Sequence, residues 1–269
     1  MLFPFHDNNP TTRNPYFTLL IILINTVVLI WMTKMPAAGQ EELIVQRGFI
    51  PARIGQLSDP KLVVHVQLDP ATPPIQLPAN QPRIYTSLFT TMFMHGGWIH
   101  LLGNMWFLWI FGNNIEDRLG HFVFLLYYVM GGLVATACHW AYDPASTIPV
   151  IGASGAVAAV LGGYAITFPQ ARVRTLVFLV VIITIMELPA LVVLGVWFIL
   201  QLIEAAGAFQ LGVGGGVGVA WWAHVGGFVA GLVMMPLLSA GTAPPGANWR
   251  EEADRQFGPR VPDSFGKRR

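Results

Sequence analysis

The sequence is poor in charge. Asp, Glu, Lys and Arg make up 11% of its residues, whereas soluble globular proteins carry roughly 25%. Hydrophobic residues make up 54%, and the mean hydropathy is +0.56. So few charges cannot cover a chain of 269 residues in water. The composition therefore excludes a soluble protein and predicts a polytopic membrane protein whose solvent is the lipid bilayer.

Cysteine and metal-binding motifs are equally scarce. The single cysteine, Cys138, excludes an internal disulfide framework, and its place in an apolar run indicates a packing role. No H-E-x-x-H motif occurs, so we expect no zinc site of that type, no other metal and no cofactor. The formal net charge is +1 and no basic stripe with interleaved aromatics is present, so nothing indicates a nucleic-acid partner.

What the sequence has instead is long apolar runs. A helix of about 17–25 apolar residues can cross a bilayer. The candidate spans cover residues 16–32, 90–111, 122–142, 154–168, 175–206 and 220–238, and the fourth is unusually short. The predicted fold class is an all-α membrane protein, a bundle of six transmembrane helices with a short fourth helix.

The fifth run is interrupted by Glu187 and Pro189, and we count it as one crossing. The part before Glu187 is too short to span, so residues 175–186 are expected to lie at the interface or to lengthen span five. Lys and Arg collect on the cytoplasmic side of a membrane. One crossing with the N-terminus inside places ten of the 15 cations inside, whereas two crossings would move the six cations of the tail outside.

This orientation fixes the expected domain organisation. Residues 1–15 form a cytoplasmic N-terminus, 16–238 a membrane domain, and 239–269 a cytoplasmic disordered tail. Within the membrane domain, residues 34–86 form an extended outer first loop that is polar and rich in proline. The lack of transit-peptide character favours a prokaryotic plasma membrane over an organelle.

The same orientation brings four polar side chains to a similar depth. Spans two, four and six all begin at the outer face, which places His100 and Asn104, Ser154, and His224 in the outer half of the membrane. Polar groups at membrane depth are costly and mark functional sites. We therefore predict a site built from these four residues.

Ser154 is the candidate nucleophile of this site, and a serine needs a base to take its proton. Asp117 and Asp143 fall in predicted loops, which excludes an intramembrane pair of aspartates. The motif GASGA lacks the last glycine of the G-x-S-x-G elbow. No lysine lies within a span, which excludes a Ser–Lys dyad, since the three lysines are Lys34, Lys61 and Lys267. His224 remains as the base, because its span starts at the same face as that of Ser154.

Small residues on spans four and six predict that the two helices pack closely. Gly227 and Gly231 form a GxxxG pattern after His224, a pattern that lets transmembrane helices approach each other. Span four carries a matching stripe of Gly155, Ala159 and Gly163. Close contact between these helices would bring the imidazole of His224 within reach of the Ser154 hydroxyl.

Acyl transfer also needs donors for a developing oxyanion. The backbone N–H of Ser154 is available, because the first N–H groups of a helix have no intrahelical acceptor. His100 and Asn104, at i and i+4, share one helix face and can add side-chain donors. The alternative is that these two only hydrogen-bond neighbouring helices. His95 is expected to fix a loop rather than to act in catalysis.

Four motifs, in order, resemble those of the rhomboid intramembrane serine proteases. HGGWIHLLGNM resembles the family's HxxxxHxxxN, IEDRLG its E-x-R, GASG its GxSG, and AHVGGFVAG its AHxxGxxxG. The resemblance covers about residues 80–238. It implies a six-helix rhomboid-like bundle with a Ser154–His224 dyad and an oxyanion site that includes His100 and Asn104.

The resemblance also implies an activity and a set of structural residues. The implied activity is proteolysis of transmembrane segments near the outer membrane face, with single-span membrane proteins as substrates. Glu116 and Arg118 would tie the second loop to its helix end. The glycines of the matching motifs are Gly152, Gly155, Gly227 and Gly231.

The chain departs from the family pattern at two places. Some members carry a tyrosine four residues after the serine, on which the histidine stacks, and this chain has Ala158 there, so His224 must be held otherwise. The usual Trp-Arg of the first loop is here Pro82-Arg83.

We expect the glycine-rich loop 207–219 to act as a lid. The tryptophans expected as interface anchors are Trp197, Trp221 and Trp222.

Two other functions compete with the protease. A non-catalytic relative would bind membrane helices without cutting them, but such proteins typically lack the serine or the histidine. A small transporter or channel would use the polar cluster as a pathway. That function predicts polar residues at both depths of the membrane, whereas the inner halves of the predicted spans are almost wholly apolar.

Overall fold

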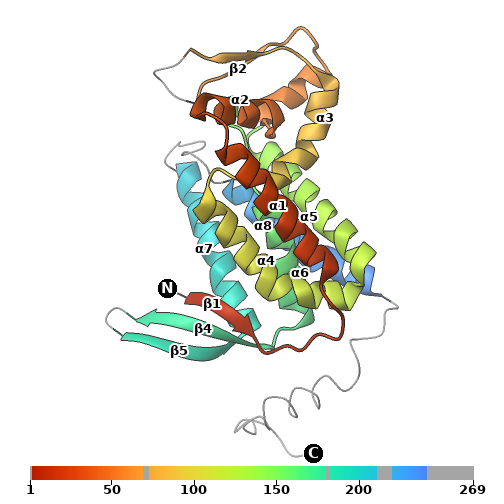
Figure 1. Ribbon diagram of the computed structural model, residues 1–269, viewed down its shortest axis with the longest axis vertical. Helices are drawn as coiled ribbons and strands as arrows, with labels where there is room; N and C mark the ends of the chain where they lie inside the picture. Colours follow the sequence, from red (N-terminus) through yellow and green to blue (C-terminus); the bar gives the residue numbers. More distant parts are fainter. Residues whose placement is uncertain (1, 69–72, 180–181, 211–219, 241–269) are drawn as a thin grey trace, which may run out of the picture.

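The protein is described by a computed structural model that places residues 2–68, 73–179, 182–210 and 220–240 (Figure 1). Its centre is a bundle of long helices that lie side by side. Helices α2 and α3 and strand β2 lie at one end of this bundle, and strands β1, β4 and β5 lie at the other. The long helices are α1 (Tyr16–Thr33), α4 (Trp98–Leu119), α5 (His121–Tyr142), α6 (Ser154–Thr167), α7 (Ala190–Gln210) and α8 (Trp221–Ser239).

Four of the six predicted spans correspond closely to a long helix. Helices α1, α5, α6 and α8 begin and end within one residue of their predicted runs. Helix α7 takes only the second part of the fifth run. The predicted bounds of the second run, 90–111, are wrong at both ends. Residues 91–93 form the short 3-10 helix η2 (Thr91–Phe93), and α4 begins only at Trp98 and continues to Leu119. Among the described helices, α1, α5 and α8 are long and apolar enough to cross a membrane, with mean hydropathies of 2.1, 1.7 and 1.5.

Helix α6 is the innermost helix. It has 14 residues, and every residue from Gly155 to Ala165 is buried. A helix that is apolar all round lies inside a bundle rather than on its surface. At 1.5 Å per residue it is about 21 Å long, shorter than the roughly 30 Å hydrocarbon core of a bilayer.

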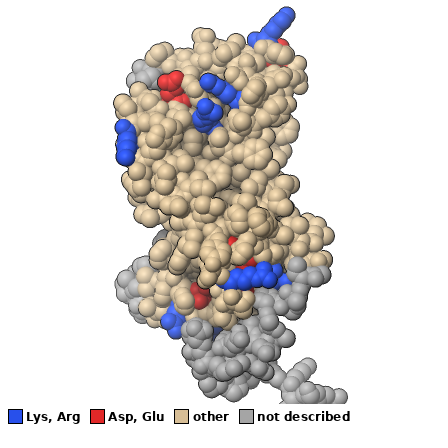
Figure 2. All heavy atoms as spheres, turned by 45° about the vertical axis from the view of Figure 1, so that its right-hand side comes forward, with Lys and Arg blue, Asp and Glu red and all other residues tan. Residues whose placement is uncertain are grey.

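The outer surface of the bundle is apolar. Exposed side chains of α1 include Leu19, Leu23, Val27 and Trp31. On the face drawn in Figure 2, the Lys, Arg, Asp and Glu side chains of the described residues lie toward the two ends of the molecule, with an uncharged band between them. This band suits the hydrocarbon core of a membrane.

The all-α expectation is wrong, because strands occur at both ends of the bundle. Strands β1 (Leu2–Asp7), β4 (Arg172–Leu179) and β5 (Ile182–Pro189) form an antiparallel sheet in the order β1–β4–β5. The stretch 175–186 therefore does not lengthen span five but folds into a hairpin. Along β4, Arg172 and Arg174 are exposed while Val173 is buried, and this two-residue alternation is typical of a strand. Arg174 pairs with Glu187 across the hairpin at 3.1 Å.

The long first loop contains secondary structure of its own. It contains α2 (Ala37–Arg47), the 3-10 helix η1 (Pro51–Leu57), the antiparallel strands β2 (Val64–Val66) and β3 (Ile75–Leu77), and α3 (Gln81–Thr90). A small core of its own holds these elements together: Val45, Ile50, Val64, Val66 and Leu77. The tail from residue 241 and the lid residues 211–219 lie outside the described residues.

Candidate functional site

The site begins at the head of α6, where Gly152 turns the chain toward Ser154. Gly152 has a φ of +125°, in the region that side chains other than glycine rarely adopt. A methyl group on it would lie 2.7 Å from Nε2 of His100, and its own N–H donates to the carbonyl oxygen of Thr91 at 2.9 Å. The glycine therefore lets the chain pass directly beside the His100 ring, two residues before Ser154.

Helix α4 supplies the second part of the site. The Nδ2 atom of Asn104 lies 3.7 Å from where a Cβ atom of Gly152 would be. Nε2 of the buried His95 lies 3.0 Å from Nδ2 of Asn104 and accepts the N–H of Ala153 at 3.4 Å. His95 thus connects the polar face of α4 to the residue immediately before Ser154.

The imidazole of His224 is held from α7. His224 is buried on α8, and its Nδ1 lies 2.6 Å from Oε1 of Gln201. The rings of Trp221 and Trp197 flank the imidazole, with centroid distances of 5.7 Å and 6.2 Å. Two of the tryptophans expected as interface anchors therefore lie against the histidine. Sequence analysis missed Gln201, although an amide in the middle of an apolar span is a signal that could have found it.

Helices α6 and α8 are in backbone contact at the predicted glycines. A methyl group on Gly227 would overlap the carbonyl oxygen of Gly155, and one on Gly231 would overlap that of Ala159. The Tyr127 hydroxyl of α5 donates at this junction, 2.6 Å from the carbonyl oxygen of Ala159 and 3.2 Å from that of Gly231. Close packing, as the GxxxG pattern predicts, thus fixes α8 against α6.

One cavity collects the four polar residues predicted from the sequence. Its volume is about 1260 Å³, and Ser154, His224, His100 and Asn104 all line it. Gln201, Trp197 and Trp221 line it as well, and so do Ile44, Gln67 and Leu68 of the first loop. The cavity therefore lies at the end of the bundle that the first loop covers.

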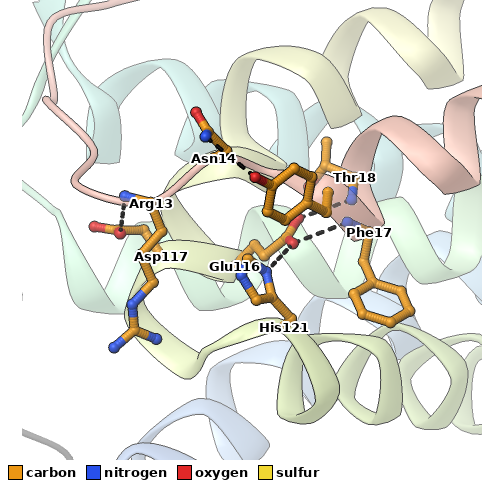
Figure 3. A network of polar contacts seen from close by, with 8 residues as sticks. Arg13, Asn14, Phe17, Thr18, Glu116, Asp117 and His121 are labelled. Atoms are coloured by element: carbon orange, nitrogen blue, oxygen red, sulfur yellow. Dashed lines mark hydrogen bonds and ion pairs between the residues drawn. The ribbon is translucent and has the colours of Figure 1, made fainter.

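Glu116 and Arg118 lie in the last turn of α4, away from the cavity. Glu116 is fully buried and accepts the backbone N–H groups of Phe17 and Thr18 at 2.9 Å and 2.8 Å, while Nδ1 of His121 lies 2.6 Å away (Figure 3). A carboxylate at these positions satisfies the free N–H groups of the first turn of α1. Glu116 thus joins α4 to the starts of α1 and α5.

Fold and site together define a helical membrane protein in which a serine and a histidine from different helices line one cavity. The family model described as Rhomboid domain matches residues 82–241, more than half of the chain, and the chain belongs to the rhomboid family. It is an integral membrane protein, and members of this family are generally intramembrane serine proteases that act on membrane proteins within the bilayer.

Curated relatives match over part of their length. Rhomboid-like protein 11, chloroplastic, from Arabidopsis thaliana is 40% identical over 29% of this chain and 27% of its own. Presenilin-associated rhomboid-like protein A, mitochondrial, from Danio rerio is 32% identical over 35% and 25%. Rhomboid protein 1, mitochondrial, from Saccharomyces cerevisiae is 32% identical over 34% and 28%. The matches thus span little more than a quarter of these relatives.

Proposed function

We propose that the chain is an intramembrane serine endopeptidase that cleaves transmembrane segments near the outer membrane face with a Ser154–His224 dyad. The observation that carries the proposal is that Ser154, His224, His100 and Asn104, from three helices, line one cavity. The site needs neither metal nor cofactor for this chemistry.

The chemical step is nucleophilic attack by Ser154. His224 takes the hydroxyl proton at Nε2 as Oγ bonds to the carbonyl carbon of the substrate peptide. The scissile C–N bond then breaks, and His224 gives the proton to the leaving amine. Water, deprotonated by the same nitrogen, attacks the acyl carbon. The bond from that carbon to Oγ then breaks, the carboxylic acid product leaves, and His224 returns the proton to Oγ of Ser154.

The oxyanion of each tetrahedral intermediate is stabilised by donors around Gly152. Ser154 is the first residue of α6, so its N–H has no intrahelical acceptor and is free to donate. His100 and Asn104 lie beside Gly152, two residues before Ser154. Removing one such donor typically lowers kcat by about 10²–10³-fold.

The membrane arrangement belongs to the same proposal. The six long helices cross the membrane with both termini in the cytoplasm, and the folded first loop lies outside. The short α6 then begins below the outer surface, where the cavity admits water. A substrate helix must unwind locally before Ser154 can reach a carbonyl group, because helical carbonyls are hydrogen-bonded. Single-span proteins of a prokaryotic plasma membrane are the proposed substrates.

Co-expression with a panel of single-span substrates tests the proposal. The native chain should cut at least one of them, and Ser154→Ala and His224→Ala should each lower the rate by about 10³-fold or more. Ser146→Ala and His65→Ala are matched controls, because neither residue lines the cavity, and both should cut normally. Cleavage that survives Ser154→Ala would refute the proposed mechanism, and binding without cleavage by every form would indicate a non-catalytic relative.

A further inference from the structure

Gln201 is the polar side chain that the sequence left unassigned. It lies in α7 with only 9% of its surface exposed, in a stretch whose neighbours Leu200 and Leu202 are exposed apolar residues. Its Oε1 is 2.6 Å from Nδ1 of His224 on α8. A buried amide on an otherwise apolar helix is costly unless it is hydrogen-bonded, and here its oxygen meets the histidine of the proposed dyad.

This contact determines which nitrogen of His224 carries the proton. A neutral imidazole has one N–H donor and one acceptor nitrogen, and the partner of one nitrogen sets the state of the other. With Oε1 of Gln201 facing Nδ1, the hydrogen bond forms when Nδ1 carries the hydrogen, because an amide oxygen can only accept. The lone pair is then on Nε2, the nitrogen that a base for Ser154 must use.

The contact also fixes the plane of the ring. In this chain Ala158 replaces the tyrosine on which a histidine could stack, and Ala158 is fully buried. Trp221 meets the imidazole edge to face, at an interplanar angle of 90°, and Trp197 is tilted by 36°. These aromatic contacts restrict the plane of the ring but do not select a tautomer. The directional hydrogen bond between Nδ1 and Gln201 does both.

A neutral acceptor suits this position. In a serine protease triad, a third group holds the histidine in the tautomer that can accept the serine proton. A carboxylate in that role would place a charge within the membrane, which is expensive. The amide supplies the acceptor oxygen without the charge.

We infer that Gln201 is the positioning residue for His224: through Nδ1 it fixes the tautomer and ring orientation in which Nε2 faces Ser154. The inference rests on the proposed protease function, and its test has a readout that does not depend on proteolysis. Gln201 contacts His224 at Nδ1, the nitrogen that does not exchange the proton with Ser154, so we expect its loss to act on kcat rather than on KM.

Kinetics of an isosteric pair of variants provide the first test. Gln201→Leu removes the acceptor at similar size, and Gln201→Glu keeps an oxygen at the same place. We expect Gln201→Leu to lower kcat by about 100-fold, with KM changed by less than about twofold. We expect Gln201→Glu to retain at least about tenfold more kcat than Gln201→Leu. Thermal unfolding of both variants in the same detergent reports whether each is folded.

Nitrogen-15 spectra of labelled histidine provide the second test, because the two ring nitrogens differ in shift when only one is protonated. The His224 signals are those absent from His224→Gln. The native chain should show Nδ1 protonated, and Gln201→Leu should move the proton partly or wholly to Nε2. Native kcat in Gln201→Leu, or a native chain protonated on Nε2, would overturn the inference.

Failure of the inference and failure of the proposed function give different results. If Ser154→Ala cuts as well as the native chain, the dyad itself is wrong. If Ser154→Ala is inactive while Gln201→Leu and Gln201→Glu lose kcat equally and keep the native histidine spectrum, the dyad stands. Gln201 is then a packing residue only, and the inference is refuted.

Discussion

At the scale of single residues, the site depends on the turn that precedes Ser154, and Gly152 is required there. Gly152 has a positive φ, and the His100 ring lies where a side chain on this residue would be. The same glycine therefore leaves space for His100 and sets the turn that leads to Ser154. His95 secures the same turn from the other side through the N–H of Ala153. The placement of the serine is thus set by the two residues before it as well as by its own helix.

Gly152→Ala should disrupt this turn. Forcing alanine into a left-handed conformation costs about 1–2 kcal/mol, and the added methyl must displace the His100 ring. We expect the rate of fluorophosphonate labelling to fall by about 100-fold, with a lower thermal midpoint. Gly195→Ala on α7 is the matched control, because nothing lies within 4 Å of its added methyl and it should label normally. Equal labelling of the two variants would contradict this account of Gly152.

Single residues also show what sequence reading can find. That Ser154, His224, His100 and Asn104 would lie near one another could be predicted, because they are polar residues in apolar runs whose ends can be counted. Gln201 stands out in the sequence as an amide in an apolar run, but its contact with His224 depends on how α7 lies against α8, and no local pattern encodes that. The contact of His95 with Ala153 joins residues 58 apart in sequence, and it too appears only in the fold.

At the scale of elements, β1 is fastened to the bundle by a buried carboxyl group. Oδ2 of Asp7 accepts from the Tyr164 hydroxyl of α6 at 2.8 Å and from Nδ2 of Asn114 of α4 at 2.7 Å. Burial raises the pKa of Asp7 from 3.8 to about 7, although both hydrogen bonds favour the charged form. Strand β1 thus packs against the bundle through a carboxyl group whose neutral form is favoured by burial.

The stability of this docking should fall as pH rises. Because the folded-state pKa of Asp7 lies above the unfolded value, the folded state binds more protons between pH 3.8 and about 7. The contribution of Asp7 to folding stability is complete below pH 3.8 and is lost as the pH rises to about 7. We expect the thermal midpoint of the native chain to decline relative to Asp7→Asn across this interval. Parallel pH profiles for the two proteins would show that Asp7 has no such role.

Elements also mark where sequence reading fails. The ends of α1, α5, α6 and α8 could be predicted because hydropathy changes sharply there. Residues 172–189 could not, since a strand rich in valine, isoleucine and threonine has the same mean hydropathy as part of a span. The elements within the first loop were not predicted, because its small core uses a few apolar residues spread through a polar, proline-rich segment.

At the scale of the whole molecule, the two ends of the bundle carry different features. The cavity with Ser154 and His224 lies under the first loop, and the sheet and the Glu116 contacts lie at the other end. Asn104 and Glu116 are twelve positions apart on α4, which is about 18 Å along a helix axis. One helix therefore carries both the proposed oxyanion donors and the anchor that fixes the start of α1.

Cysteine accessibility tests how this molecule sits in the membrane. In a Cys138→Ala background, Ser58→Cys places a thiol on the exposed surface of the first loop, and Asn14→Cys places one at the opposite end. A membrane-impermeant maleimide added to intact cells should label position 58 alone. Permeabilised cells should label both. Labelling of position 14 in intact cells, with position 58 protected, would reverse the proposed orientation.

The central claim is that Ser154 and His224 share a proton inside the cavity, and covalent trapping tests it most directly. The purified full chain is treated with a fluorophosphonate, and mass spectrometry locates the adduct. We predict an adduct on Ser154 in the native chain and none in Ser154→Ala. We predict at least about 10³-fold slower labelling in His224→Ala. An adduct on another residue, or labelling of Ser154 at the native rate without His224, would contradict it.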